Sequence, residues 1–160
     1  MLYYPLFLKL QGEAVLVVGG GRVALRKCKK LVEAGARVTV VSPRILPEFE
    51  KLGVQVVARE FRPSDIESPK LIFAATNRRE VNAEVKRCAD ARGIPVNVAD
   101  CLEECSFLVP ATLERGNVQI AVSTSGQNPR LAKQLRIHLE KLLAELDKES
   151  ERVDHKHATS

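Results

Sequence analysis

Residues 14–24 read Ala-Val-Leu-Val-Val-Gly-Gly-Gly-Arg-Val-Ala, and this stretch decides the fold. Five apolar residues lead directly into three glycines, and helix-forming residues follow. An unbroken apolar run of this length is typical of a strand buried on both faces of a parallel sheet. The glycines predict a turn that lets the backbone approach a ligand at the N-terminus of a helix. In register the motif is G-x-G-x-x-A: Gly19 makes the turn, Gly21 leaves room for a pyrophosphate, and Ala24 lets helix and strand pack closely.

The context of the glycines favours a dinucleotide site over a structural turn with no ligand. A second buried strand is expected at residues 37–41, after the turn Ala34-Gly35-Ala36. This completes a βαβ unit of about thirty residues, which is the setting that the motif requires.

The composition fits a cytoplasmic protein, and its excess of basic residues fits either an anionic ligand or plain solubility. The 160 residues predict one domain, with at most a small appendage, and 25 basic against 20 acidic residues give a net charge of +5. The basic residues are spread along the chain without an aromatic platform, so no nucleic-acid partner is expected. No apolar run is long enough to cross a bilayer, and residues 1–10 lack the features of a signal peptide, so no membrane partner is expected either.

The four cysteines do not predict a metal site. Cys28, Cys88, Cys101 and Cys105 contain no C-x-x-C pair. Cys28 and Cys88 fall at apolar positions of expected helices, where a reduced cysteine packs as a small apolar side chain.

Strands and helices alternate through the first hundred residues. The fold class is therefore α/β, with a Rossmann-like, doubly wound parallel sheet covered by helices on both faces. The expected strands are residues 14–18, 37–41, 54–58, 71–75 and 95–99, and the expected helices are 23–34, a short one near 46–52, and one around 81–89 that ends before Gly93. We assign residues 1–103 to this NAD-binding domain.

The pattern changes after residue 103. Residues 107–109 and 118–122 predict a β-hairpin, joined through residues 114–117. A long helix is expected over residues 129–146, with Asn128 as its N-cap and a stripe of leucines that favours packing against a second subunit. We assign residues 104–146 to a dimerisation segment and expect residues 147–160 to be a disordered, charged tail.

Polar residues at the strand ends are the candidate cofactor contacts. The end of the second strand carries Ser42-Pro43-Arg44, where NAD-binding folds usually place an acid for the ribose. Ser42 could contact the ribose and Arg44 a 2′-phosphate, so these residues leave NAD and NADP open, and Ser42-Pro43 could equally end the strand and no more. Thr76 and Asn77 follow the fourth strand and are expected to face the cofactor.

Asp100 ends the fifth strand, beside the expected nicotinamide end of the crevice. A partly buried carboxylate there can act as a general base, and the alternative is that it caps the following turn.

Several separated motifs resemble precorrin-2 dehydrogenase, the module also found at the N-terminus of sirohaem synthases. They are residues 18–27 (VGGGRVALRK), 74–77 (AATN) with Val81-Asn82, 96–100 (VNVAD), 105–111 (CSFLVPA) and 121–132 (AVSTSGQNPRLA). The resemblance implies NAD-dependent oxidation of precorrin-2 to sirohydrochlorin in sirohaem biosynthesis. It also implies cofactor contacts at Gly21, Arg22, Val23, Pro43 and Arg44, and it places the proposed general base of the family on Asp100.

The resemblance extends to the second half of the chain. It implies a homodimer built through the hairpin and the following helix, and a polycarboxylate substrate for which Arg115, Arg130, Lys133 and Arg136 are the candidate partners. Some members also insert iron into sirohydrochlorin. Members usually continue into a helical third domain, whereas this sequence ends at Ser160, so part of the substrate cleft is expected to be missing or supplied by another subunit. The competing hypotheses are a non-catalytic NAD-sensing module and a sirohydrochlorin ferrochelatase.

Overall fold

The computed structural model describes residues 3–157 and divides into two units, residues 4–107 and the segment from Leu108 onward, to which Tyr3 also belongs. The boundary lies later than the one expected after residue 103. The reason is that the chain stays on the sheet through Phe107: the Ser106 amide donates to the Val96 carbonyl at 2.8 Å, and the Phe107 ring packs edge-on against Phe73 with centroids 5.4 Å apart.

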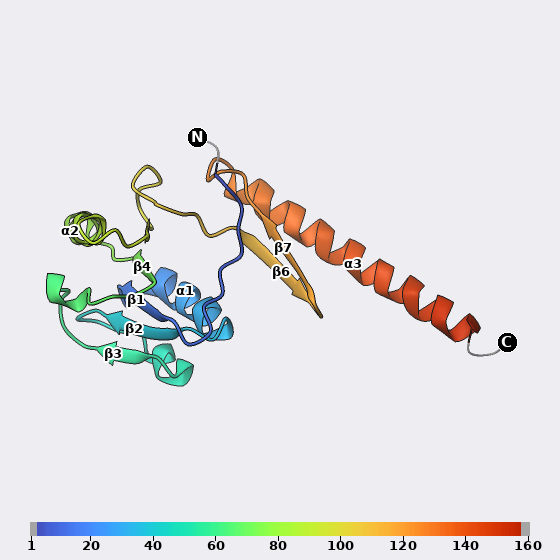
Figure 1. Ribbon diagram of the computed structural model, residues 1–160, viewed down its shortest axis with the longest axis horizontal. Coiled ribbons are helices and arrows are strands. Elements are labelled where there is room, and N and C mark those ends of the chain that lie inside the picture. The colour runs from blue at the N-terminus through green and yellow to red at the C-terminus, as the bar shows by residue number, and fades with distance from the viewer. Residues whose placement is uncertain (1–2, 158–160) are drawn as a thin grey trace. The chain divides into compact units, whose positions relative to one another are not determined.

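The first unit is built on a five-stranded parallel sheet (Figure 1). Its strands run in the order β3-β2-β1-β4-β5, so β1 is central. The chain moves from β1 through β2 to β3 on one side, and β4 and β5 lie on the other side. The strands are β1 (Ala14–Val18), β2 (Arg37–Val41), β3 (Gln55–Val57), β4 (Leu71–Ala74) and β5 (Val96–Val98). The doubly wound α/β sheet predicted from the sequence is confirmed.

The helices cover opposite faces of this sheet because successive strand side chains alternate between the faces. Val15 and Val17 of β1 pack with Leu25 and Cys28 of α1 (Arg22–Glu33) in one core cluster. Leu16 and Val18 pack with Val85 and Cys88 of α2 (Arg79–Asp90) in the other. Two short 3₁₀ helices, η1 (Pro47–Leu52) and η2 (Pro63–Asp65), complete the connections. Cys28 and Cys88 are buried as predicted.

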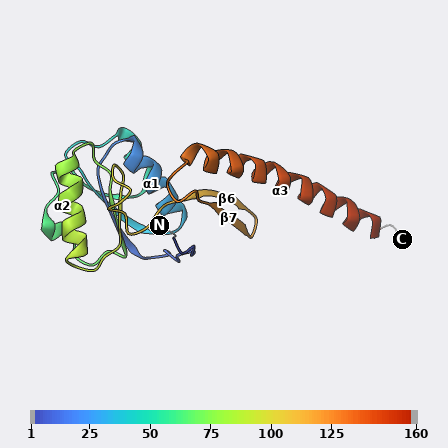
Figure 2. The same cartoon turned by 90° about the horizontal axis from the view of Figure 1, so that it is seen from above.

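The second unit consists of an antiparallel hairpin and one long helix. The hairpin pairs β6 (Ala111–Arg115) with β7 (Val118–Val122), and α3 (Pro129–His157) follows and packs along it (Figures 1 and 2). The prediction that residues 107–109 form the first strand of the hairpin is wrong, because that strand is β6. Arg115 pairs with Val118, so the turn is only Gly116-Asn117, and a two-residue turn of this kind places the strand directly before it.

The start of α3 follows the prediction and its end does not. Asn128 Oδ1 accepts the Leu131 amide at 2.9 Å, as expected of an N-cap. The helix then continues to His157, although a disordered tail was expected from residue 147. Residues 147–153 contain several good helix formers, and extending an existing helix needs no new nucleus. Residues 158–160 lie outside the described part of the chain.

None of the helices within residues 3–157 has the length and apolar character needed to span a membrane.

Candidate functional site: a pocket at the carboxyl ends of the strands

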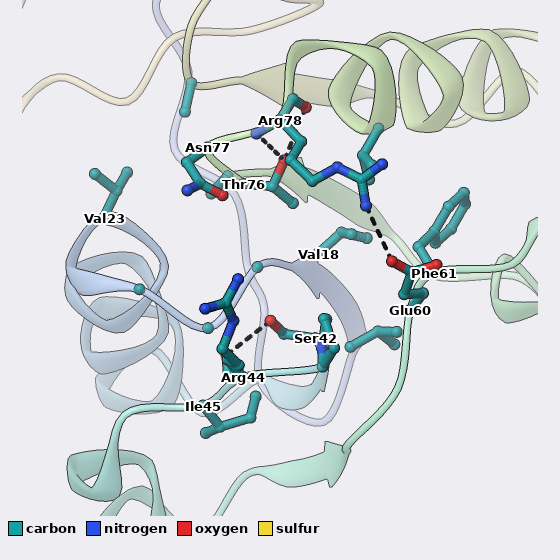
Figure 3. A pocket seen from close by; sticks show the side chains of 18 of the residues that line it. Val18, Val23, Ser42, Arg44, Ile45, Glu60, Phe61, Thr76, Asn77 and Arg78 are labelled. Atoms are coloured by element: carbon teal, nitrogen blue, oxygen red, sulfur yellow. Dashed lines mark hydrogen bonds and ion pairs between the residues drawn. The ribbon is translucent and has the colours of Figure 1, made fainter.

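A pocket of about 890 Å³ opens in the first unit where β1, β2 and β4 end (Figure 3). In a doubly wound sheet this edge is where ligands bind, because the strand order reverses there. The pocket is lined by every residue proposed from the sequence to contact the cofactor, namely Gly19, Gly21, Arg22, Val23, Ser42, Pro43, Arg44, Thr76 and Asn77. Asp100 lines it as well. Residues from four separate parts of the sequence therefore meet at one site.

The three glycines differ in what surrounds them. Gly19 has a φ of +127°, and a Cβ there would lie 2.4 Å from the Ala75 carbonyl oxygen. A Cβ on Gly20 would lie 2.1 Å from the Arg44 carbonyl oxygen, whereas a Cβ on Gly21 would meet nothing within 4 Å. Gly19 and Gly20 thus allow the turn to pack against neighbouring backbone, and Gly21 borders open space in the pocket. The sequence assigned no role to Gly20, because its neighbour Arg44 comes from another loop.

The N-terminus of α1 faces this open space. Gly21 is its N-cap and provides no side-chain hydrogen bond, and the first turn contains no acidic residue. The first amides of the helix therefore lack an internal acceptor, and together with the helix dipole they favour an anion such as a phosphate. The residues present fit the pyrophosphate of a dinucleotide.

The end of β2 presents a hydroxyl and a guanidinium. The Ser42 hydroxyl donates to the Arg44 carbonyl at 2.8 Å, which holds the loop and leaves the oxygen only as an acceptor. Arg44 is exposed at the pocket, and the described residues give its side chain no hydrogen bond or ion pair (Figure 3). No carboxylate occupies the end of this strand.

The end of β4 is held by Asn82, a fully buried residue of α2. Its amide oxygen accepts the Thr76 hydroxyl at 2.7 Å and the Thr76 amide at 3.1 Å, and its amide group donates to the Thr76 carbonyl at 3.2 Å. Thr76 therefore shapes the turn, and Asn77 beside it is exposed in the pocket. The sequence noted Asn82 only within a motif, because its partners become clear only once the turn is folded.

Arg78 lies across the rim of the pocket. Its guanidinium contacts Glu60, which follows β3, at 3.0 Å (Figure 3). It also contacts Glu80 of α2 at 2.7 Å. The hydrogen bond with Glu80 is the main cause that raises the pKa of Arg78. This exposed network joins two strand-end loops on opposite sides of the pocket.

Asp100 sits at the pocket in an ion pair with α2. Arg79 Nη1 donates to Asp100 Oδ1 at 3.2 Å, and Arg79 Nη2 contacts Glu104 Oε1. Within the described residues no backbone group donates to the Asp100 carboxylate, so the alternative role of Asp100 as a turn cap has no hydrogen bond to support it. The sequence did not predict the contact with Arg79.

Lys27 of α1 is held by the sheet. Its ammonium donates to Asn97 Oδ1 at 2.7 Å and lies 5.0 Å from the centre of the Phe73 ring. Burial lowers the pKa of Lys27. Asn97 in turn donates to the Phe107 carbonyl at 3.0 Å, and Cys105 Sγ accepts the Val98 amide at 3.2 Å. These bonds fix the segment that follows Asp100 against the sheet.

The four basic residues suggested for the substrate lie in the second unit. Arg115 ends β6, and the other three lie in the first turns of α3, where Arg136 pairs with Glu140 at 2.9 Å. Their role with a substrate stays a prediction. Among the described residues, no group of three or more His, Cys, Asp or Glu side chains is arranged to hold a metal.

Comparison with known proteins identifies the family. A family described as Putative NAD(P)-binding matches residues 6–111, and one described as Sirohaem biosynthesis protein central matches residues 115–142. The solved structure of SirC, precorrin-2 dehydrogenase, superposes with a TM-score of 0.75 at 32% identity, covering 87% of this chain and 70% of that one. The chain belongs to the putative NAD(P)-binding family and to the family of precorrin-2 dehydrogenase. The resemblance drawn from the sequence motifs is confirmed.

Relatives of this family include much longer proteins. The siroheme synthase of Pseudomonas paraeruginosa is 46% identical over 144 residues, which cover 88% of this chain and 31% of the relative. Siroheme synthase 1 of Aeromonas salmonicida is 44% identical over 147 residues, with 89% and 31% covered. The chain thus spans about a third of the length of these relatives.

Proposed function

We propose that this chain oxidises precorrin-2 to sirohydrochlorin with NAD as the hydride acceptor, on the route to sirohaem. The observation that carries the proposal is that Asp100 and the glycine turn line the same pocket. Membership of a family that includes a precorrin-2 dehydrogenase supports the choice of substrate.

NAD, when bound, supplies a hydride acceptor. The N-terminus of α1 and the open side of Gly21 would hold the pyrophosphate, and the loop from Ser42 to Arg44 would hold the adenosine ribose. Thr76 and Asn77, which follow β4 and line the pocket, are further polar residues that would contact the cofactor.

Asp100 would take the proton that must leave the substrate. Oxidation removes two electrons and two hydrogens, so one hydrogen departs as hydride and the other as a proton. Only Oδ1 of Asp100 accepts a hydrogen bond from the described residues, which leaves Oδ2 to receive that proton. Placing the two acceptors at fixed positions beside one substrate lowers the entropic cost of the step.

In this proposal, two copies of the chain form a homodimer in the cytoplasm. Leu131, Leu135 and Leu142 of α3 are 42%, 43% and 50% exposed, so this stripe offers apolar surface for a second copy of the chain. The basic residues of the second unit would then help to bind the carboxylates of the substrate. Free thiols at all four cysteines suit a reducing compartment.

One assay separates this function from its alternatives. The protein is mixed with precorrin-2 and NAD, and sirohydrochlorin and NADH are followed together by absorbance. Dehydrogenase activity predicts that both rise in equal amounts and that neither rises without NAD. Binding of NAD without any conversion would indicate a sensing module. Insertion of ferrous iron into sirohydrochlorin in the absence of NAD would indicate a ferrochelatase.

A further inference from the structure

Asp100 shares one guanidinium with a second carboxylate. Arg79, the first residue of α2, reaches Asp100 Oδ1 with one nitrogen and Glu104 Oε1 with the other. The three side chains keep 45%, 35% and 32% of their surface exposed, in the order Arg79, Asp100 and Glu104. One positive charge therefore serves two negative charges at the edge of the pocket.

Glu104 depends on Arg79 more than Asp100 does. Its second oxygen, Oε2, is shielded from solvent and accepts no hydrogen bond. An ionised carboxylate in this position needs its positive partner, because an unpaired, shielded charge is costly. The hydrogen bond with Glu104 is also the main cause that raises the pKa of Arg79, so the guanidinium keeps its charge.

Among the described residues, Arg79 alone contacts the Asp100 carboxylate by a hydrogen bond or ion pair. Other charged groups line the same pocket without contacting it: Arg22 on α1, Arg44 after β2, Glu60 after β3, and Arg78, Glu80 and Glu84 at the start of α2. Of these, Arg78, Glu60 and Glu80 are already paired with one another. Lys27 of α1 is not among the residues that line the pocket, and its ammonium donates to Asn97 Oδ1.

We propose that Arg79 is a positioning residue for Asp100 and that Glu104 holds Arg79 in place. Arg79 donates to Oδ1 of Asp100 and leaves Oδ2 without a hydrogen bond from the described residues, while Glu104 contacts the other nitrogen of the guanidinium. The role in catalysis rests on the proposed dehydrogenase, but the positioning contact itself does not.

Two variants separate the contacts of Arg79. In Arg79→Gln the Asp100 carboxylate loses the guanidinium that holds Oδ1, so its side chain is expected to leave the orientation that it has in the wild type. In Glu104→Gln the contact between Arg79 and Asp100 remains, so the orientation of Asp100 is expected to be retained.

The orientation of Asp100 is compared in crystal structures of the full chain, which need no turnover. Lys86→Gln is the matched control, because it removes one positive charge from an i,i+4 pair with Asp90 on the same helix. It should leave the Asp100 side chain where it is in the wild type. An Asp100 side chain that keeps its wild-type orientation in Arg79→Gln, or loses it in Lys86→Gln, would overturn the proposal.

Turnover adds a second readout where the wild type oxidises precorrin-2. Arg79→Gln should lower kcat about tenfold to a hundredfold, while KM for NAD changes by less than about twofold. Arg79→Lys should not restore kcat, since an ammonium cannot span both carboxylates as a guanidinium does. A wild type that is inactive while Asp100 still changes its orientation in Arg79→Gln would reject the dehydrogenase and leave the positioning contact standing. A wild-type kcat in Arg79→Gln would reject the positioning role alone.

Discussion

At the scale of single residues, Gly20 and Gly21 are neighbours in sequence with opposite surroundings. Gly20 faces the Arg44 carbonyl, whereas Gly21 faces open pocket. The first contact stabilises the fold, and the second space is available to a ligand. Replacing each glycine by alanine therefore separates stability from cofactor binding.

Gly21→Ala is expected to fold as the wild type does and to bind NAD more weakly. Its backbone is extended with a φ of −90°, which alanine adopts without strain. The added methyl group would occupy space proposed for the pyrophosphate and should weaken NAD binding by about tenfold or more. Gly20→Ala should instead lower the free energy of unfolding by about 1–3 kcal/mol through overpacking. Thermal unfolding and NAD titration of both variants measure the two effects. Wild-type NAD affinity in Gly21→Ala would contradict the assignment of this space.

The residues of the pocket were predictable from sequence where they follow a strand directly. Glycines after an apolar run, and polar residues after later runs, must meet at one edge of a parallel sheet. Lys27 and Arg79 were not predictable in the same way. Each sits on a helix where basic residues usually face solvent, and its partner is 70 or 21 residues away in sequence. Such contacts depend on side-chain directions that no local pattern records.

At the scale of elements, the strands of the sheet were predictable and the hairpin was only partly so. The apolar run at residues 14–18 and the valine-rich stretch at residues 37–41 predicted β1 and β2 to the residue. In β6 only Leu113 is buried, so the sequence of this strand lacks a strong apolar pattern. The strand was therefore predicted at the nearby apolar run, residues 107–109. Phe107 of that run packs on Phe73 of the sheet. Burial in a different unit was therefore mistaken for strand character.

The connection from β3 to η2 is held by a charged pair that makes it sensitive to acid. Arg59 Nη1 donates to Asp65 Oδ2 at 2.9 Å, and the Arg62 amide donates to the same oxygen at 2.8 Å. The hydrogen bond from Arg59 is the main cause that lowers the pKa of Asp65. Because the folded pKa is lowered, this stabilisation is fully present above the unfolded value of about 4 and is lost as pH falls through the folded pKa.

Asp65→Asn should accordingly lower the free energy of unfolding by about 1–3 kcal/mol at neutral pH. The difference from wild type should shrink as pH falls below about 4, since the wild-type carboxyl is then protonated as well. Urea unfolding at a series of pH values measures the loss of unfolding free energy at neutral pH and its decrease in acid. Asp90→Asn, which removes an exposed acid from an i,i+4 pair, should cost no more than about 0.5 kcal/mol. A loss in Asp65→Asn that persisted unchanged into acid would contradict the account.

At the scale of the whole molecule, the exposed leucines of α3 predict how two copies associate. We expect light scattering to find a dimer for the wild type and a monomer for the double variant Leu135→Glu/Leu142→Glu. Two buried charges at an apolar interface are strongly unfavourable. Lys141→Glu changes an exposed position of the same helix and should remain dimeric. A wild type that is monomeric at micromolar concentration would reject this surface as the dimer interface.

Asp100→Asn is the decisive variant for the proposed role of Asp100, which is to take the proton when precorrin-2 is oxidised by NAD. Asparagine keeps the shape of the side chain and cannot accept that proton. With NAD and precorrin-2 saturating, kcat should fall by about a hundredfold to ten-thousandfold while the affinity for NAD stays at the wild-type value. A wild-type kcat in Asp100→Asn would show that Asp100 is not the base.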